Sequence, residues 1–200
     1  MRLAQSYFLS DNVVAIARNL LGKELFTNID GKICSGIISE TEAYEGITDK
    51  ASHAYGNRRT KRTETMYKEG GRTYVYLCYG MHHLLNIVTA KENTPHAVLI
   101  RGIIPNTGKD IMFKRTNKKK LTNISNGPAK MSKALGITTD LDNTLLDDNK
   151  IWIEDSNFPL SGFEIIVGKR IGIDYAQEDA LLPYRFLLAN KKKSKKNPDA

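Results

Sequence analysis

The sequence predicts an α+β fold, built as one domain around a largely antiparallel β-sheet with helices to its sides. Three observations support this prediction. The chain of 200 residues is long enough to bury one sizeable core without disulfides or metals. Most of its strand-like segments follow one another directly, as neighbouring antiparallel strands do. No internal repeat and no interdomain linker interrupts them.

The first expected element is an amphipathic helix over residues 11–21, where apolar residues recur at helical spacing. Ser10 or Asp11 is suited to cap its first turn, because a short polar side chain there accepts a hydrogen bond from an unpaired backbone N–H. Gly22 is suited to end the helix, since glycine adopts positive φ without strain.

Two strands are expected next, over 24–29 and 33–44. Asp30-Gly31 between them is a strong hairpin signal, because a two-residue turn needs positive φ at both positions. The polar segment 45–71 follows and contains four glycines. It is predicted to be loop with short helical turns, and it is too long to serve only as a connection.

A second hairpin is expected over Thr73–Val88, where strand-like sequence flanks Tyr79-Gly80. A turn at Tyr79 lifts its ring away from the core. In a basic protein, the stacked bases of a nucleic acid are the obvious partner for such a ring. Tyr74 and Tyr76 share one face of the strand, and cross-strand packing explains them as readily as function does.

The second half of the chain supplies the remaining elements. The expected strands cover 97–104, 151–153 and part of 165–173. The expected helices cover 108–115 and 129–135, and the segment 181–188 closes the fold. One domain is therefore expected over 1–190, followed by a lysine-rich, disordered tail over 191–200.

The net charge is +8, and the tail 191–200 carries half of it with five lysines and one aspartate. Within the domain, 58–72 and 114–120 are rich in lysine and arginine, whereas 140–155 is acidic. Basic loops with a separate acidic face suit a polyanionic partner. Ordinary solvated loops would give the same composition, so charge alone leaves both interpretations open.

No run of about 18 apolar residues is present, so no membrane-spanning helix and no membrane partner are expected. The N-terminus has too short an apolar stretch, and too early an acid, for a secretory signal. We therefore expect the protein in the cytoplasm, associated with the nucleoid if the source is a bacterium.

Glu42 is the first candidate for chemistry. Strand alternation places Glu40, Glu42 and Tyr44 on one face, where the strand meets the long polar loop. An acid beside an aromatic ring in that position could act as a general base next to a stacked ligand. A solvated carboxylate at a strand end is the alternative explanation.

Two further polar residues interrupt apolar strands. Arg101 lies in an apolar run, and a buried guanidinium needs a carboxylate or a phosphate beside it. Asn86 lies between Leu85 and Ile87, and a ligand or a structural hydrogen bond must satisfy its amide. For both residues, a structural and a functional role remain open.

The histidines give weaker signals. His53 in the polar loop could donate a hydrogen bond to a ligand or orient a phosphate, or it could be a loop residue without a role. His82 and His83 follow the second hairpin turn without a third ligand at metal spacing. We therefore expect no metal site.

Six short motifs occur in an order that resembles the alkyladenine (3-methyladenine) DNA glycosylase family of base-excision repair. The resemblance extends from about Arg2 to Phe186, and the six together are far more specific than any one alone. They are E-T-E-A-Y at 40–44, A-S-H at 51–53, Y-V-Y-x-x-Y-G-M at 74–81, N-I at 86–87, V-L-x-R at 98–101 and G-P-x-K at 127–130.

The resemblance implies a curved, mainly antiparallel sheet with a projecting β-hairpin. It also implies that Glu42 activates the attacking water and that Arg101 helps hold that water and a nearby phosphate. The matching positions imply further roles as follows: Tyr44, His53 and Tyr76 as walls of the base pocket, Asn86 as the residue that disfavours a guanine 2-amino group, Tyr79 as the wedge that fills the gap left by a flipped nucleotide, and Met81 and Leu99 as further pocket or groove contacts. His82 departs from the aromatic residue that many relatives carry beside the wedge, so its groove contact is expected to be weaker or more polar.

The activity implied is that of a monofunctional, monomeric DNA glycosylase without metal or other cofactor. It would flip alkylated or deaminated purines out of double-stranded DNA and hydrolyse the N-glycosidic bond, leaving an abasic site. A non-catalytic nucleic-acid-binding module that uses the hairpin aromatics is the alternative. Glu42 counts against that alternative, because a carboxylate facing a polyanion would repel it. An enzyme of free nucleosides is a third, weaker hypothesis, because a nucleoside offers no duplex for Tyr79 to invade.

Overall fold

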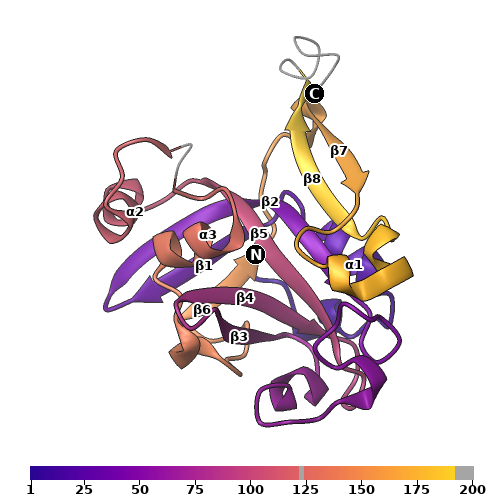
Figure 1. Cartoon of the computed structure of the whole chain (residues 1–200). Coiled ribbons are helices and arrows are strands. Elements are labelled where there is room, and N and C mark those ends of the chain that lie inside the picture. The colour runs from indigo at the N-terminus through magenta and orange to yellow at the C-terminus, as the bar shows by residue number, and fades with distance from the viewer. Residues whose placement is uncertain (122–123, 192–200) are drawn as a thin grey trace.

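The computed structural model describes residues 1–121 and 124–191, which form one antiparallel sheet with helices around it (Figure 1). The sheet has eight strands in the order β3-β4-β5-β2-β1-β6, and β8 joins it by pairing with both β2 and β7. The strands are β1 (Glu24–Ile29), β2 (Lys32–Tyr44), β3 (Arg72–Cys78), β4 (His82–Thr89), β5 (His96–Pro105), β6 (Ile151–Glu154), β7 (Phe163–Gly168) and β8 (Arg185–Asn190). The predicted α+β class with a mainly antiparallel sheet is confirmed.

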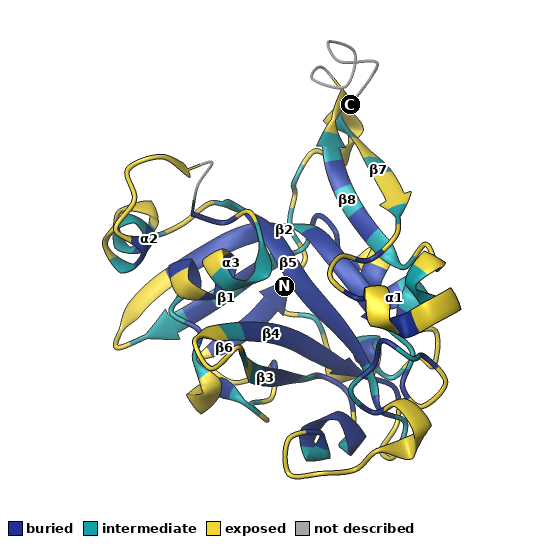
Figure 2. Ribbon diagram, viewed as in Figure 1, coloured by how far each residue is buried: buried dark blue, intermediate teal, exposed yellow. Residues whose placement is uncertain are grey.

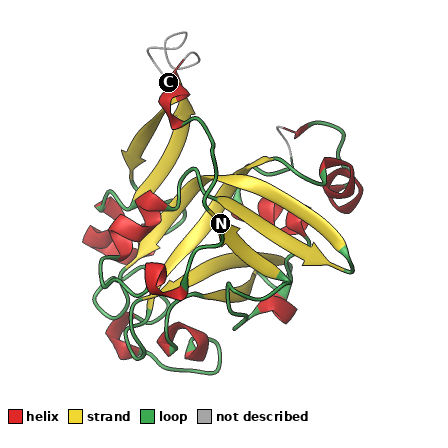
Figure 3. Cartoon of the chain, turned by 180° about the vertical axis from the view of Figure 1, so that it is seen from behind, coloured by secondary structure: helices red, strands yellow, loops and turns green. Residues whose placement is uncertain are grey.

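Strand β2 organises the sheet because it pairs with three others. Along one side it pairs with β5, and along the other side first with β1 and then with β8. The register against β5 shifts on both sides of Glu40, as at a β-bulge. Beyond this point β7 and β8 extend away from the rest of the sheet, as Figure 3 shows from behind.

Both hairpin turns confirm the local prediction. Asp30 and Gly31 have φ values of 55° and 71°, and Tyr79 and Gly80 have 51° and 68°. The second turn is closed by the Met81 N–H, which donates to the Cys78 carbonyl over 3.2 Å. A bulky residue at positive φ is uncommon and costs conformational energy, so Tyr79 is not the residue that the turn itself would favour.

Three α-helices flank the sheet: α1 (Val13–Asn19), α2 (Lys109–Thr116) and α3 (Pro128–Leu135). The cap of α1 differs from the prediction, because neither Ser10 nor Asp11 forms it. Asn12 does, accepting a hydrogen bond from the Ala15 N–H over 2.8 Å. Helix α3 begins at Pro128 and ends at Gly136 with φ of 74°, as predicted.

The segment 45–71 forms short 3₁₀ turns at Tyr55–Asn57 and Glu64–Tyr67 between irregular stretches, as expected. The strand expected in part of 165–173 is confirmed over 165–168. Strand β7 begins two residues before that segment and ends at Gly168, so 169–173 lie outside the strand. The predicted tail at 191–200 lies outside the described residues except for Lys191.

The core fills the space between the sheet and the helices. Figure 2 shows the central strands buried, whereas much of β7 and the β1–β2 turn is exposed. Its largest fully buried side chains include Phe8, Leu25, Ile38, Ile87 and Ile100. In the described part of the chain, no helix is long and apolar enough to cross a membrane.

Candidate active site

A cavity of about 470 Å³ opens where the ends of β2, β3, β4 and β5 meet the long loops; we call it the central pocket. Its volume suits a ligand of purine size, since small-molecule pockets begin at about 300 Å³. Aromatic and cationic side chains line it together with aliphatic ones. The polar and aromatic lining residues are Tyr44, His53, Arg62, Tyr74, Tyr76, Tyr79, Asn86, Arg101 and Tyr175.

Glu42 lies directly behind the wall of this pocket and is fully buried. Its Oε1 accepts a hydrogen bond of 2.8 Å from the backbone N–H of Ile171, and its Oε2 accepts one of 2.8 Å from the Tyr44 hydroxyl. Arg101 Nε lies 3.3 Å from Oε1. All three partners line the pocket, so they connect the carboxylate to it.

Arg101 is shared between two carboxylates, which confirms that its guanidinium meets acids inside the strand layer. Its Nε lies 3.0 Å from Glu40 Oε1, and Arg185 Nε reaches the same oxygen over 2.6 Å. Two cations therefore balance Glu40 and Glu42 in a buried cluster. An unpaired charge there would cost several kcal/mol, so each member depends on the others.

Burial raises the pKa of Glu42 above the ordinary value of a glutamate. The Arg101 guanidinium, the Ile171 N–H and the Tyr44 hydroxyl all act against this rise, and the Glu40 carboxylate adds to it. A carboxylate with a raised pKa is a stronger base than one in water, which suits it to accept a proton from a bound water.

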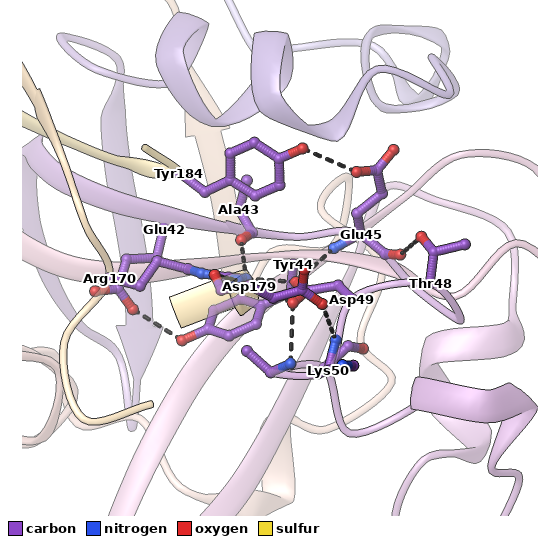
Figure 4. A network of polar contacts seen from close by, with 12 residues as sticks. Glu42, Ala43, Tyr44, Glu45, Thr48, Asp49, Lys50, Arg170, Asp179 and Tyr184 are labelled. Atoms are coloured by element: carbon purple, nitrogen blue, oxygen red, sulfur yellow. Dashed lines mark hydrogen bonds and ion pairs between the residues drawn. The ribbon is translucent and has the colours of Figure 1, made fainter. Parts of the chain in front are cut away.

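Arg170 holds the end of β2 in place (Figure 4). Its guanidinium donates to the Ala43 carbonyl over 2.9 Å, forms a two-pronged ion pair with Asp49, and lies over the Tyr44 ring at 4.8 Å from its centroid. Asp49 also accepts the Glu45 N–H over 3.1 Å. The Tyr44 ring is thereby fixed on one wall of the central pocket.

Sequence reasoning did not identify Arg170, Ile171 or Arg185. They come from the β7–β8 connection and the start of β8, and Ile171 meets Glu42 across 129 positions of sequence. The local signal is Gly172, which has a φ of 77° and lies two residues after Arg170. That signal indicates a turn, and it says nothing about where the turn docks.

An aromatic cluster forms another part of the pocket wall. The rings of His53 and Tyr76 lie 4.7 Å apart at 71°, Tyr74 and Tyr76 lie 5.4 Å apart, and the Arg62 guanidinium lies 4.8 Å over Tyr76. His53 Nδ1 is 2.9 Å from the Tyr74 hydroxyl. Tyr74 is almost completely buried and orients the histidine, which identifies a structural role for it.

Burial lowers the pKa of His53 to about 4, and the nearby Arg62 and Arg58 contribute to the shift. His53 is therefore neutral at pH 7 and presents an uncharged imidazole to the pocket. A neutral ring can donate or accept one hydrogen bond at each nitrogen without repelling a cationic ligand.

The folded protein should lose stability in mild acid because of His53. Its folded pKa lies below the unfolded value of about 6.5, so its contribution is complete above pH 6.5 and is lost as the pH falls towards 4. We expect about 2 kcal/mol of this loss between pH 7 and pH 5. Urea unfolding of wild type and His53→Gln at both pH values measures it.

His96→Gln is the matched comparison, because burial lowers the pKa of His96 as well. Between pH 7 and pH 5, this variant should still lose the part of the free energy of unfolding that depends on His53. Equal acid sensitivity in wild type and His53→Gln would contradict a neutral, buried His53.

The mouth of the central pocket carries two exposed aromatic side chains. Tyr79 is 90% exposed at the hairpin tip, and Tyr175 is 67% exposed on the segment that follows β7. Tyr175 donates its hydroxyl to the Ala51 carbonyl over 3.3 Å. The rest of the hairpin tip is also solvated, and Met81 is 69% exposed.

Seven of the ten residues predicted for the site line this single pocket: Tyr44, His53, Tyr76, Tyr79, Asn86, Leu99 and Arg101. Glu42 lies just behind them, and Met81 and His82 line a neighbouring cavity instead. Asn86 donates its side-chain amide to the Tyr74 carbonyl over 3.1 Å, which fixes its orientation in the wall. Leu99 is buried in the wall, away from the exposed hairpin tip.

The arrangement combines a buried carboxylate with a neighbouring pocket that several aromatic side chains line. Among residues 1–121 and 124–191, no three histidines, cysteines or acids lie close enough together to hold a metal ion. A carboxylate that takes a proton from water, beside a pocket for a ring, is the equipment for hydrolysis of a bond to that ring.

Comparison with known proteins agrees with this chemistry. The chain matches the family model described as "Methylpurine-DNA glycosylase (MPG)" over residues 7–192. A Chlamydia felis protein named "Putative 3-methyladenine DNA glycosylase" is 51% identical over 197 residues, which are 97% of this chain and 99% of that protein. Proteins of the same name from Chlamydia pneumoniae and Clostridium perfringens are 48% and 44% identical, over 94% and 96% of this chain and 95% and 98% of their own. These matches cover the whole central pocket and its carboxylate cluster. The chain belongs to the methylpurine-DNA glycosylase family.

Proposed function

We propose that this DNA glycosylase, a hydrolase of N-glycosyl bonds, flips damaged purines out of the duplex into the central pocket and cleaves them with a water activated by Glu42. The proposal rests on the contact between the Glu42 carboxylate and the central pocket: Tyr44, Ile171 and Arg101, which contact Glu42, also line the pocket. A base inside a duplex is shielded from attack at C1′, so extrusion must precede chemistry.

The tyrosines of the pocket favour a purine that carries positive charge. Of the two arginines that also line the pocket, Arg101 is balanced by Glu40 and Glu42, whereas the charge of Arg62 opposes a cationic ligand. Tyr44 and Tyr76 offer ring faces, and a cationic ring such as N3-methyladenine is attracted to an aromatic face more strongly than a neutral one. His53 is neutral and adds no opposing charge. Alkylated bases also stack and pair poorly, so less energy is needed to extrude them. Hypoxanthine, a neutral deaminated purine, would depend more on hydrogen bonds from the pocket.

Cleavage proceeds through a transition state with positive charge on the sugar, as in other glycosidic hydrolyses. The ionised Glu42 stabilises that charge and takes the proton as water attacks C1′. Arg101 holds Glu42 in place and keeps its carboxylate ionised. The base leaves with the bonding electrons, and an abasic site remains in the strand.

The residues that line the central pocket favour hydrolysis of the base without nicking of the strand. Bifunctional glycosylases attack C1′ with an amine nucleophile and form a Schiff base. In the described part of the chain, none of the residues that line the central pocket is a lysine. We therefore propose a monofunctional enzyme. We also propose that it is monomeric, with one catalytic domain over 1–190, and that it works in the cytoplasm, associated with the nucleoid if the source is a bacterium.

The direct test is release of free base from a duplex that contains N3-methyladenine or hypoxanthine, detected by chromatography. The strand should remain intact until the abasic site is cleaved with alkali. Binding of the duplex without any release of base would contradict the proposal and favour a non-catalytic module. Cleavage of free nucleosides at a comparable rate would favour a nucleoside hydrolase.

The rate of base release should fall in acid, because the reaction needs the ionised form of Glu42. Since burial raises the pKa of Glu42, the fall should begin at a higher pH than for an exposed glutamate, whose pKa is about 4.3. Single-turnover rates on N3-methyladenine across the acid range measure this limb. An acid limb at or below the ordinary value would contradict a buried general base.

A further inference from the structure

A second cavity, of about 630 Å³, lies beside the hairpin tip; we call it the tip groove. The tip contributes Tyr79 to the central pocket and Met81 and His82 to the tip groove. In the same way, Pro128 of α3 lines the central pocket and Ala129 the groove. The hairpin tip and the first turn of α3 therefore separate the two cavities.

The groove is bordered by cations from three separate elements. Lys32 begins β2, Lys114 lies in the last turn of α2, and Lys133 lies on α3, and all three are exposed. Figure 1 shows the β1–β2 turn, α2 and α3 on the same side of the molecule. Asp30 is the one acid among the described lining residues.

Within residues 1–121 and 124–191, these lysines form no ion pair. Among the described residues, no carboxylate lies within 4.0 Å of Lys32, Lys114 or Lys133. Arg115, by contrast, is bonded to the Ala134 carbonyl over 3.3 Å and to Cys34 Sγ over 3.4 Å, so it supports the packing of α2. The three lysines are available to an anion outside the chain.

The chemistry favours a run of phosphates over a single anion. One small anion is usually held by converging donors, such as a guanidinium fork or a nest of backbone N–H groups. Lysines on flexible stems, spread over three elements, act as separate point charges and suit the spaced phosphates of a nucleic-acid backbone.

The position of the tip groove beside the hairpin tip indicates which part of the nucleic acid would bind there. If a nucleotide enters the central pocket and Tyr79 fills its place, the duplex must continue past the hairpin tip on the side of Met81 and His82. We propose that the tip groove holds one arm of the duplex, on one side of the lesion, with Lys32, Lys114 and Lys133 on its phosphates. This inference rests on the proposed function and adds to it that the enzyme grips DNA asymmetrically about the lesion.

Two lesion duplexes test the proposal, one with its long arm on the 5′ side of the lesion and one with it on the 3′ side. Affinities are measured for wild type and for the triple variant Lys32→Ala, Lys114→Ala, Lys133→Ala over a range of salt concentrations. For the duplex whose long arm crosses the groove, the triple variant should bind more weakly, and its salt dependence should be shallower by about 2 to 3 in log–log slope.

The other duplex should be bound with nearly the wild-type affinity and salt slope. The matched control is Arg18→Ala, Lys91→Ala, Lys150→Ala, which removes the same charge from exposed cations that line none of the cavities described above. Thermal melting checks that both triple variants are folded.

Equal weakening for the two duplexes, or no weakening, would overturn the proposal. Equal weakening would mean that the lysines act only through the overall field of the protein. Failure of the proposed function looks different: wild type would then release no base from either duplex.

Discussion

Replacing Glu42 with glutamine should abolish most base release while leaving lesion-duplex binding intact. Glutamine keeps an oxygen that can accept the Ile171 N–H and nearly the same volume, but it cannot take a proton from water or balance positive charge on the sugar. General-base catalysis contributes about 10²- to 10⁴-fold, so the single-turnover rate should fall by about that factor. Chromatography of released base and anisotropy of a labelled duplex measure the two effects separately.

The matched control for this variant is Glu164→Gln, which makes the same chemical change on the exposed face of β7. It should release base at the wild-type rate. A Glu42→Gln enzyme that cleaves as fast as wild type would show that another group activates the water. Loss of binding together with rate would instead indicate collapse of the Glu40–Arg101–Glu42 cluster, which thermal melting would reveal.

The features that sequence predicted well are those governed by local chemistry. Asp30-Gly31 and Tyr79-Gly80 form two-residue turns, and each pair contains a glycine, which adopts positive φ without strain, between two strand-like segments. The pairing of Arg101 with acids followed from the cost of burying an unpaired guanidinium within an apolar strand. Neither inference needed knowledge of the rest of the fold.

The features that sequence did not predict depend on long-range docking. The Ile171 N–H reaches Glu42 only because β8 pairs with β2 and directs the β7–β8 connection against the end of that strand. Every residue except proline has a backbone N–H, so the residue type at position 171 does not reveal this contact. The local sequence around Arg170 and Arg185 does not distinguish them from ordinary surface arginines. The charge balance of the site depends on Glu40 Oε1, which Arg101 and Arg185 share across distant parts of the sequence.

Replacing Tyr79 with asparagine should weaken extrusion of the base while leaving the protein folded. Asparagine tolerates positive φ better than tyrosine does, so the turn at φ of 51° should form at least as well as in wild type. The ring, however, is lost, and with it the group that fills the gap in the duplex. Stacking of one aromatic side chain with a base is worth about 1 to 3 kcal/mol, so lesion-duplex affinity and base release at limiting enzyme should fall by about 5- to 150-fold.

Tyr79→Phe separates the shape of the wedge from its hydroxyl. It retains the ring and should stay close to wild type, whereas the asparagine variant should also show less extrusion when a fluorescent base analogue reports unstacking beside the lesion. Unchanged affinity, rate and extrusion in Tyr79→Asn would sink the assignment of the wedge. Such a result would also leave an exposed tyrosine at positive φ without a purpose. Because a turn residue with this conformational cost persists only where something repays it, the stability and the activity of Tyr79→Asn should move in opposite directions.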